Sequence, residues 1–141
     1  MSATLQFGCV AIGGRGLLIC GAPGSGKSSL ALALIDRGAV LVGDDCTSLA
    51  AEGGRLIAAA PPRIGGVLEV RNVGLVSMPV SGPVAVSLVV RLDRDAPRFI
   101  DAAEQVEIEG VTLPLVRLWP DSAVLALRAE IAFRTYGLSL R

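Results

Sequence analysis

The chain contains no histidine, one lysine and only five aromatic residues, which are three Phe, one Trp and one Tyr. Without histidine, and with three cysteines far apart in sequence, the usual zinc-binding spacings are excluded. Few aromatic residues and a balance of 13 basic against 13 acidic residues argue against a nucleic-acid-binding surface. No run of about twenty apolar residues occurs, so the sequence predicts no membrane span.

The length and composition predict one domain covering residues 1–141. A hydrophobic content of 52% supplies enough side chains for a sizeable core. Cys9 and Cys20 lie in apolar, strand-like runs, so we expect them to pack in that core. The first eight residues have no basic region before an apolar one and do not resemble a secretion signal. Together with the odd number of widely spaced cysteines, this predicts a cytoplasmic protein.

A glycine-rich stretch matches the phosphate-binding loop pattern at every required position, and it runs Gly21-Ala22-Pro23-Gly24-Ser25-Gly26-Lys27-Ser28. An apolar run precedes it and a helix-forming segment, beginning with Ser29, follows it, which is the strand–loop–helix context that the motif needs. Successive backbone N–H groups of such a loop point at a phosphate chain, and the start of the helix adds its positive end. The only lysine of the chain stands at the motif's lysine position, where its compact charge reaches the outer phosphates.

Hydrophobic periodicity and glycine pairs predict the remaining elements. Strands are expected at 4–12, 16–20, 39–42, 67–71 and 84–92, with hairpins at 46–59 and 106–113 and a loop around 63–67. A first helix is expected over 29–36 and a last one to Tyr136, capped by Asp121 or Ser122. The strand at 39–42 should run parallel to the loop-bearing strand and lie beside it. The fold class is therefore α/β, a single P-loop kinase-type domain with a central mixed sheet, β-hairpins and few helices.

Two adjacent carboxylates follow the strand at 39–42. Asp44 and Asp45 come 17 and 18 residues after Lys27, at the carboxyl end of a parallel strand, where open α/β sheets bind their ligands. One carboxylate can hold Mg²⁺ while the other accepts a proton from an attacking hydroxyl. Glu69 is a second metal-ligand candidate, with Arg71 on the same strand face. Arg91, Arg94 and Arg98 could each stabilise the charge of a transition state, and spacing alone does not choose among them.

The combination resembles the catalytic domain of bacterial HPr kinase/phosphorylase. The resemblance is carried by residues 21–28, 34–45, 60–62 and 68–74, and more loosely by the chain around Arg98 and Glu104-Gln105. The short form is similar to versions that lack the family's extra amino-terminal domain. The resemblance implies a kinase that phosphorylates a serine of the small phosphocarrier protein HPr of the phosphotransferase system. It also implies a homo-oligomer, since the family tends to form hexamers.

Residue roles follow from the resemblance by position. It implies that Lys27 and the loop, including Ser29, bind ATP, and that Ser28 and Glu69, with Asp44, hold Mg²⁺. It also implies that the Asp44–Asp45 pair supplies the acid/base carboxylate, and that Arg98 is the active-site arginine.

Three positions depart from the family pattern. Gln6 stands where the family has a catalytic histidine, and glutamine cannot carry a proton at neutral pH. Asn72 replaces a usual glycine, and the family's stretch for phosphorolysis is not recognisable at 114–121. These departures argue most strongly against phosphorolysis, the reverse of the kinase reaction. The alternative is an ATP-binding sensor that binds the carrier with little or no turnover. A third possibility is a small-molecule kinase. Such enzymes usually need a lid and a second substrate pocket, and little of this chain remains to form them.

Overall fold

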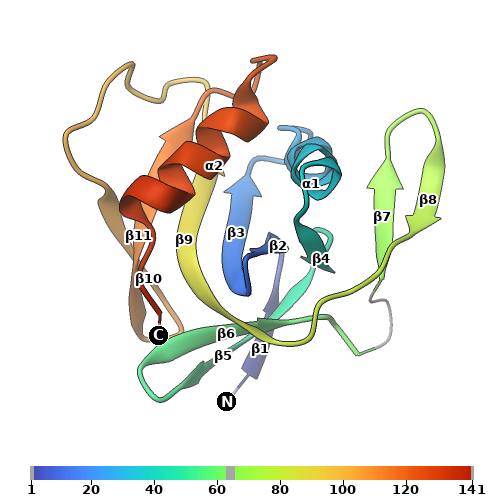
Figure 1. Cartoon of the computed structure of the whole chain (residues 1–141), viewed down its shortest axis with the longest axis horizontal. Helices are drawn as coiled ribbons and strands as arrows, with labels where there is room; N and C mark the ends of the chain where they lie inside the picture. Colours follow the sequence, from blue (N-terminus) through green and yellow to red (C-terminus); the bar gives the residue numbers. More distant parts are fainter. Residues whose placement is uncertain (1, 63–65, 141) are drawn as a thin grey trace.

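A strongly curved mixed sheet carries both helices on one face (Figure 1). The computed structural model describes residues 2–62 and 66–140. In chain order its elements are β1 Ser2–Leu5, β2 Gly8–Ile12, β3 Arg15–Gly21, α1 Lys27–Asp36, β4 Val40–Gly43, β5 Thr47–Glu52, β6 Arg55–Ala59, β7 Val67–Val70, β8 Gly74–Ser77, β9 Val84–Leu92, β10 Glu104–Ile108, β11 Val111–Leu118 and α2 Leu125–Tyr136.

The most apolar segment forms the centre of the sheet. Strand β9 pairs in parallel with β3 on one side and β11 on the other, and its start pairs antiparallel with β6. Its side chains are buried on both faces, which explains why the sequence there is an almost continuous apolar run. The sequence predicted this strand with the same bounds.

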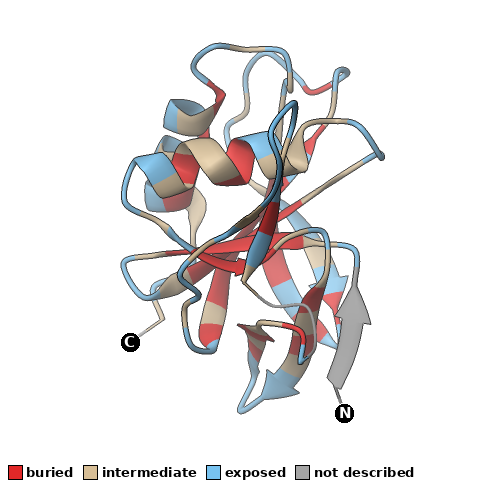
Figure 2. Cartoon of the chain, turned by 90° about the vertical axis from the view of Figure 1, so that its right-hand side faces the viewer, coloured by how far each residue is buried: buried red, intermediate tan, exposed pale blue. Residues whose placement is uncertain are grey.

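Alternation along the loop-bearing strand divides the core into two clusters. Leu17 and Ile19 face the helices, whereas Leu18 faces the other side, against residues of β5, β6, β10 and β11. Cys9 is wholly buried in this second cluster, and burial raises the pKa of its thiol. Figure 2 shows the buried residues concentrated in the sheet and on the inner sides of the helices. The predicted core role of Cys9 is confirmed.

The expected neighbour of the loop-bearing strand is wrong. β4 pairs with β2, and β2 lies between β4 and β3. Because both of these pairings are antiparallel, β4 still points the same way as β3. The predicted direction therefore holds, and the carboxyl ends of both strands reach the same edge of the sheet. The early strand expected over 4–12 is interrupted at residues 6 and 7, which separate β1 from β2.

The last helix begins later than its predicted caps. Val124, not Asp121 or Ser122, is the residue before the first turn. Ser122 forms a turn ahead of the helix, where its Oγ accepts the Val124 N–H at 3.2 Å and its carbonyl accepts the Leu125 N–H at 3.3 Å. After the helix, the chain returns to the sheet, where the buried Ser87 hydroxyl donates to the Leu138 carbonyl at 2.8 Å.

The β7–β8 hairpin forms a small sheet of its own beside α1 (Figure 1). Leu68 anchors it, since this side chain is fully buried against the helix-side core. Asn72 turns the hairpin with a φ of 70°, a left-handed conformation that glycine and asparagine tolerate best. Most of the loop expected around 63–67 falls on 63–65, outside the described residues. No described helix is long and apolar enough to cross a membrane.

Gly43 generates a prediction about stability. A Cβ at this position would collide with the Cys46 carbonyl and the Thr47 hydroxyl. We expect Gly43→Ala to lower the free energy of unfolding by about 1–3 kcal/mol, because the turn that presents Asp44 must shift. Gly82→Ala is the control, since that position has open space and ordinary backbone, and it should change stability by less than about 0.5 kcal/mol. Equal unfolding midpoints in urea for the two variants would contradict this account.

Candidate functional site

The glycine-rich loop connects β3 to α1 and adopts conformations that glycine permits. Gly21, Gly24 and Gly26 have φ values of 152°, 79° and 106°. A Cβ on Gly21 would lie 2.7 Å from the Ser25 hydroxyl oxygen, so the loop closes on itself too tightly for a side chain there. Gly26 is the residue before the first helical turn and offers no side chain to cap it. The first N–H groups of α1 are therefore free to meet an anion.

The loop lysine is held in place by two oxygens. Lys27 Nζ donates to the Gly21 carbonyl at 3.1 Å and lies 3.4 Å from Asp45 Oδ1. The lysine side chain is 11% exposed and that of Asp45 is 55% exposed, so the carboxylate compensates a largely buried charge from the solvent side. The loop lysine and one member of the acidic pair thus form an ion pair at the mouth of the loop.

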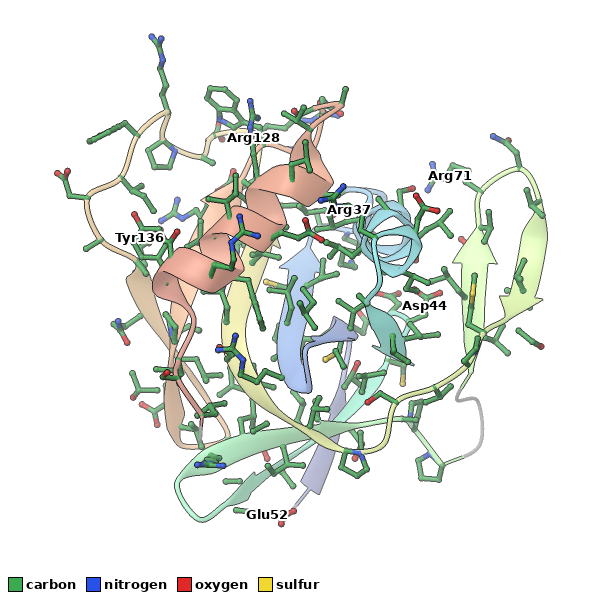
Figure 3. All side chains as sticks on the ribbon, viewed as in Figure 1. Arg37, Asp44, Glu52, Arg71, Arg128 and Tyr136 are labelled. Atoms are coloured by element: carbon green, nitrogen blue, oxygen red, sulfur yellow. The ribbon has the colours of Figure 1, made fainter. Side chains whose placement is uncertain are left out.

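Asp44 joins three parts of the chain. One carboxylate oxygen accepts the Ser28 hydroxyl at 2.6 Å, and the other accepts the Glu69 backbone N–H at 2.8 Å. The loop helix, the end of β4 and the β7–β8 hairpin thus meet at one half-buried side chain. In Figure 3, Asp44 lies between β4 and the hairpin, and Arg71 extends from the hairpin toward α1.

A cavity of about 150 Å³ lies over the loop. Residues of the loop, of the acidic pair and of the hairpin line it: Pro23, Gly24, Gly26, Lys27, Ser28, Ser29, Asp45, Glu69 and Arg71. The structure therefore brings together most of the residues that the sequence singled out. It adds Arg71, which the sequence named only as the neighbour of Glu69. The sequence predicted Glu69 and Arg71 on one face of a strand over 67–71. β7 ends at Val70 and Arg71 lies in the following turn, yet both residues line the cavity.

The oxygen donors fit a hard divalent cation. Ser28, Asp44 and Glu69 offer a hydroxyl and two carboxylates, which is the donor chemistry that Mg²⁺ prefers. Within residues 2–62 and 66–140, no three His, Cys, Asp or Glu side chains form a metal-binding group. A Mg²⁺ site made of few protein ligands, completed by substrate phosphates and water, is the kind that this donor set fits.

The candidate arginine Arg98 lies away from the loop cavity. Arg98 is exposed and lines a separate cavity of about 310 Å³ with Arg117, Trp119 and Arg128. The Arg117 guanidinium donates to Glu104 at 2.7 Å, and this hydrogen bond lowers the pKa of the Glu104 carboxyl. The structure does not place Arg98 among the residues that line the loop cavity.

Arg94 lies closer to the loop. It pairs with Asp121 at 3.5 Å, and both line a cavity of about 320 Å³ that borders loop residues 22–25. Gln6 is exposed, two residues before β2, on the edge of the sheet that carries the loop. It is not among the residues that line the loop cavity.

Comparison with known proteins identifies the family of the chain. The family model described as HPr Serine kinase C-terminal domain matches residues 2–118. The HPr kinase/phosphorylase of Geobacillus kaustophilus is 40% identical over 90% of the chain, and that of Nitrosomonas europaea is 32% identical over 91%. The chain spans 46% and 45% of those two relatives, about half of their length.

A solved structure has the same fold. The Hpr(Ser) kinase/phosphatase from Coxiella burnetii superposes with a TM-score of 0.82 at 28% sequence identity, covering 94% of each chain. The family match, the two relatives and this superposition all point to one group of proteins. The chain therefore belongs to the HPr kinase family, and it matches the C-terminal domain of that family.

Proposed function

We propose that the chain is an ATP- and Mg²⁺-dependent protein kinase that phosphorylates a serine of an HPr-like phosphocarrier protein. The observation that carries the proposal is the convergence of Lys27, Ser28, Asp45 and Glu69 on one cavity at the start of α1. A phosphate chain in the loop would place its outer phosphate between the lysine and the acidic pair. A carrier of this kind would present its serine on a surface loop, in line with that phosphate.

The contacts of the two carboxylates suggest different roles for them. Both oxygens of Asp44 already accept hydrogen bonds, from Ser28 and from Glu69, which suits a fixed ligand position. The Asp45 side chain is 55% exposed and forms an ion pair with Lys27, so its carboxylate is accessible to an incoming hydroxyl. We assign Asp44 with Ser28 and Glu69 to Mg²⁺ and Asp45 to general base catalysis.

The proposed transfer step moves one proton and one phosphoryl group. The Asp45 carboxylate accepts the serine proton while the serine oxygen forms a bond to the γ-phosphorus. The bond from that phosphorus to the bridging oxygen breaks, and ADP leaves. Lys27 stabilises the charge on the outer phosphates, and turning toward them would release Asp45 from its ion pair. Bound Mg²⁺ supplies neutralisation of the phosphate charge.

Removing the loop lysine tests the phosphate site. We expect Lys27→Ala to lower the rate of phosphoserine formation by about 10²–10³-fold, since one electrostatic stabiliser of the transition state is lost. The measurement incubates the purified protein with ATP, Mg²⁺ and the HPr-like protein of its host. Arg134→Ala, an exposed change on α2, is the matched control and should retain the native rate. No phosphoserine from the native chain above the Lys27→Ala background would reject the kinase.

Replacing each carboxylate by its amide separates their roles. Asp45→Asn should slow phosphate transfer by about 10²–10⁴-fold and leave Mg²⁺-ATP binding near its native affinity, because only the proton acceptor is removed. Asp44→Asn should weaken ATP binding in the presence of Mg²⁺ more than in its absence. Single-turnover rates and calorimetry measure the two effects. The reverse pattern would exchange the two assignments.

A second candidate function rests on Gln6. The residue is exposed, lies outside the loop-cavity lining and cannot carry a proton at neutral pH. If catalysis requires a titrating group at this position, the protein is an ATP-binding module that binds the carrier without turnover. Under the kinase proposal, Gln6→Ala should change the transfer rate by less than about threefold, since the base is Asp45. ATP-dependent carrier binding without phosphotransfer, together with a large gain from Gln6→His, would favour the sensor.

A further inference from the structure

A second cavity opens on the other flank of the loop helix. It has a volume of about 190 Å³ and lies between the first turns of α1 and the segment that leads from β11 into α2. Figure 1 shows the start of α2 next to the amino-terminal end of α1. Its two walls are made chiefly of small or apolar residues, among them Ser29, Leu30, Ala33, Pro120, Ala123 and Ala126.

This cavity adjoins the phosphate-binding cavity. Gly26 and Ser29 line both, so one extended ligand can pass from one to the other across the start of α1. The start of the helix is also where the inner phosphates of a nucleotide are held, by the free N–H groups of the first turn. A group attached to the inner phosphate therefore emerges beside Ser29.

The strand order sets the direction of the ligand. Across the sheet the order is β11, β9, β3, β2 and β4, and the loop follows β3. The acids follow β4 on one side of the loop, and they mark the end where the outer phosphate is transferred. The segment after β11 lies on the opposite side. The nucleoside must then point away from the acids and toward that segment.

The lining of this cavity indicates the class of ligand. Among the residues that the structure describes, no charged side chain lines it, and Ser29 and Ser122 contribute the polar side chains of its walls. Leu30, Pro120 and Leu125 offer apolar surface for a flat ring. By contrast, the cavity that borders residues 22–25 contains the Arg94–Asp121 pair and touches the first half of the loop.

We infer that the cavity between α1 and the β11–α2 segment binds the nucleoside of the nucleotide with little preference for the base. The inference rests on the proposed function, because it assumes that a nucleoside triphosphate occupies the loop. Different bases present hydrogen-bond donors and acceptors at different positions. A cavity whose walls offer few hydrogen-bonding side chains cannot discriminate strongly between them. We expect ATP and GTP to bind with affinities within about tenfold of each other.

Filling the cavity from either wall tests the inference. Ala123→Phe changes an exposed residue and Ala33→Phe a half-buried one on the opposite wall. Calorimetry on the full chain would compare Mg²⁺ complexes of ATP, GTP and tripolyphosphate. Each variant should lose at least about tenfold in affinity for both nucleotides but less than about twofold for tripolyphosphate, which has no nucleoside. Leu127→Phe, exposed on α2 and outside the cavity, is the matched control and should bind all three as the native chain does.

The possible results have separate meanings. Native affinity of Ala123→Phe for ATP would overturn the inference and place the nucleoside elsewhere. A preference for ATP over GTP above about a hundredfold would overturn its base tolerance. If the native chain bound neither ATP nor tripolyphosphate, the proposed kinase function itself would fail. Retained tripolyphosphate binding also shows that a variant is folded, so loss of ATP alone supports the inference.

Discussion

The site depends on the double hydrogen bond made by Asp44. Its two carboxylate oxygens accept the Ser28 hydroxyl and the Glu69 N–H, and they connect the loop helix, β4 and the β7–β8 hairpin. Such charge-assisted bonds are stronger than neutral ones, and a half-buried carboxylate favours them. Because the hairpin forms a sheet of its own, this contact and buried Leu68 set where Glu69 and Arg71 lie relative to the loop.

The second pairing in the site joins Lys27 to Asp45. Lys27 is largely buried, and burying an unpaired ammonium is costly, so Asp45 and the Gly21 carbonyl compensate it. A polyphosphate offers more negative charge than one carboxylate and would compete for the lysine. Under the proposed function, Lys27 and Asp45 would compensate each other's charge without ligand. Once the phosphates bind Lys27 and release Asp45, the same two side chains would act in the transfer.

The chain keeps the central part of the family's site and departs from the family pattern at two described positions, Gln6 and Asn72. The chain covers about half of its curated relatives, and that half contains the loop, the acidic pair and the hairpin. Asn72 takes a left-handed turn that glycine would also accept, so this departure preserves the hairpin. The departure at Gln6 is of another kind, because it concerns chemistry and not backbone conformation. Glutamine cannot carry a proton at neutral pH, as the histidine implied by the family resemblance could. Its exposed position outside the loop cavity is consistent with a site in which Asp45 handles the proton.

Local patterns in the sequence were sufficient for the loop, the strand before it, the helix after it, the central strand at 84–92 and the glycine-turned hairpins, because each depends on neighbouring residues alone. The acidic pair followed from the same reasoning. The insertion of β2 between β3 and β4, the position of the hairpin over the loop and the separation of Arg98 from it depend on pairing between distant segments. Local periodicity does not specify such partners, since many registers bury similar apolar area. Only the packed tertiary structure decided which carboxylate holds Ser28 and which pairs with Lys27.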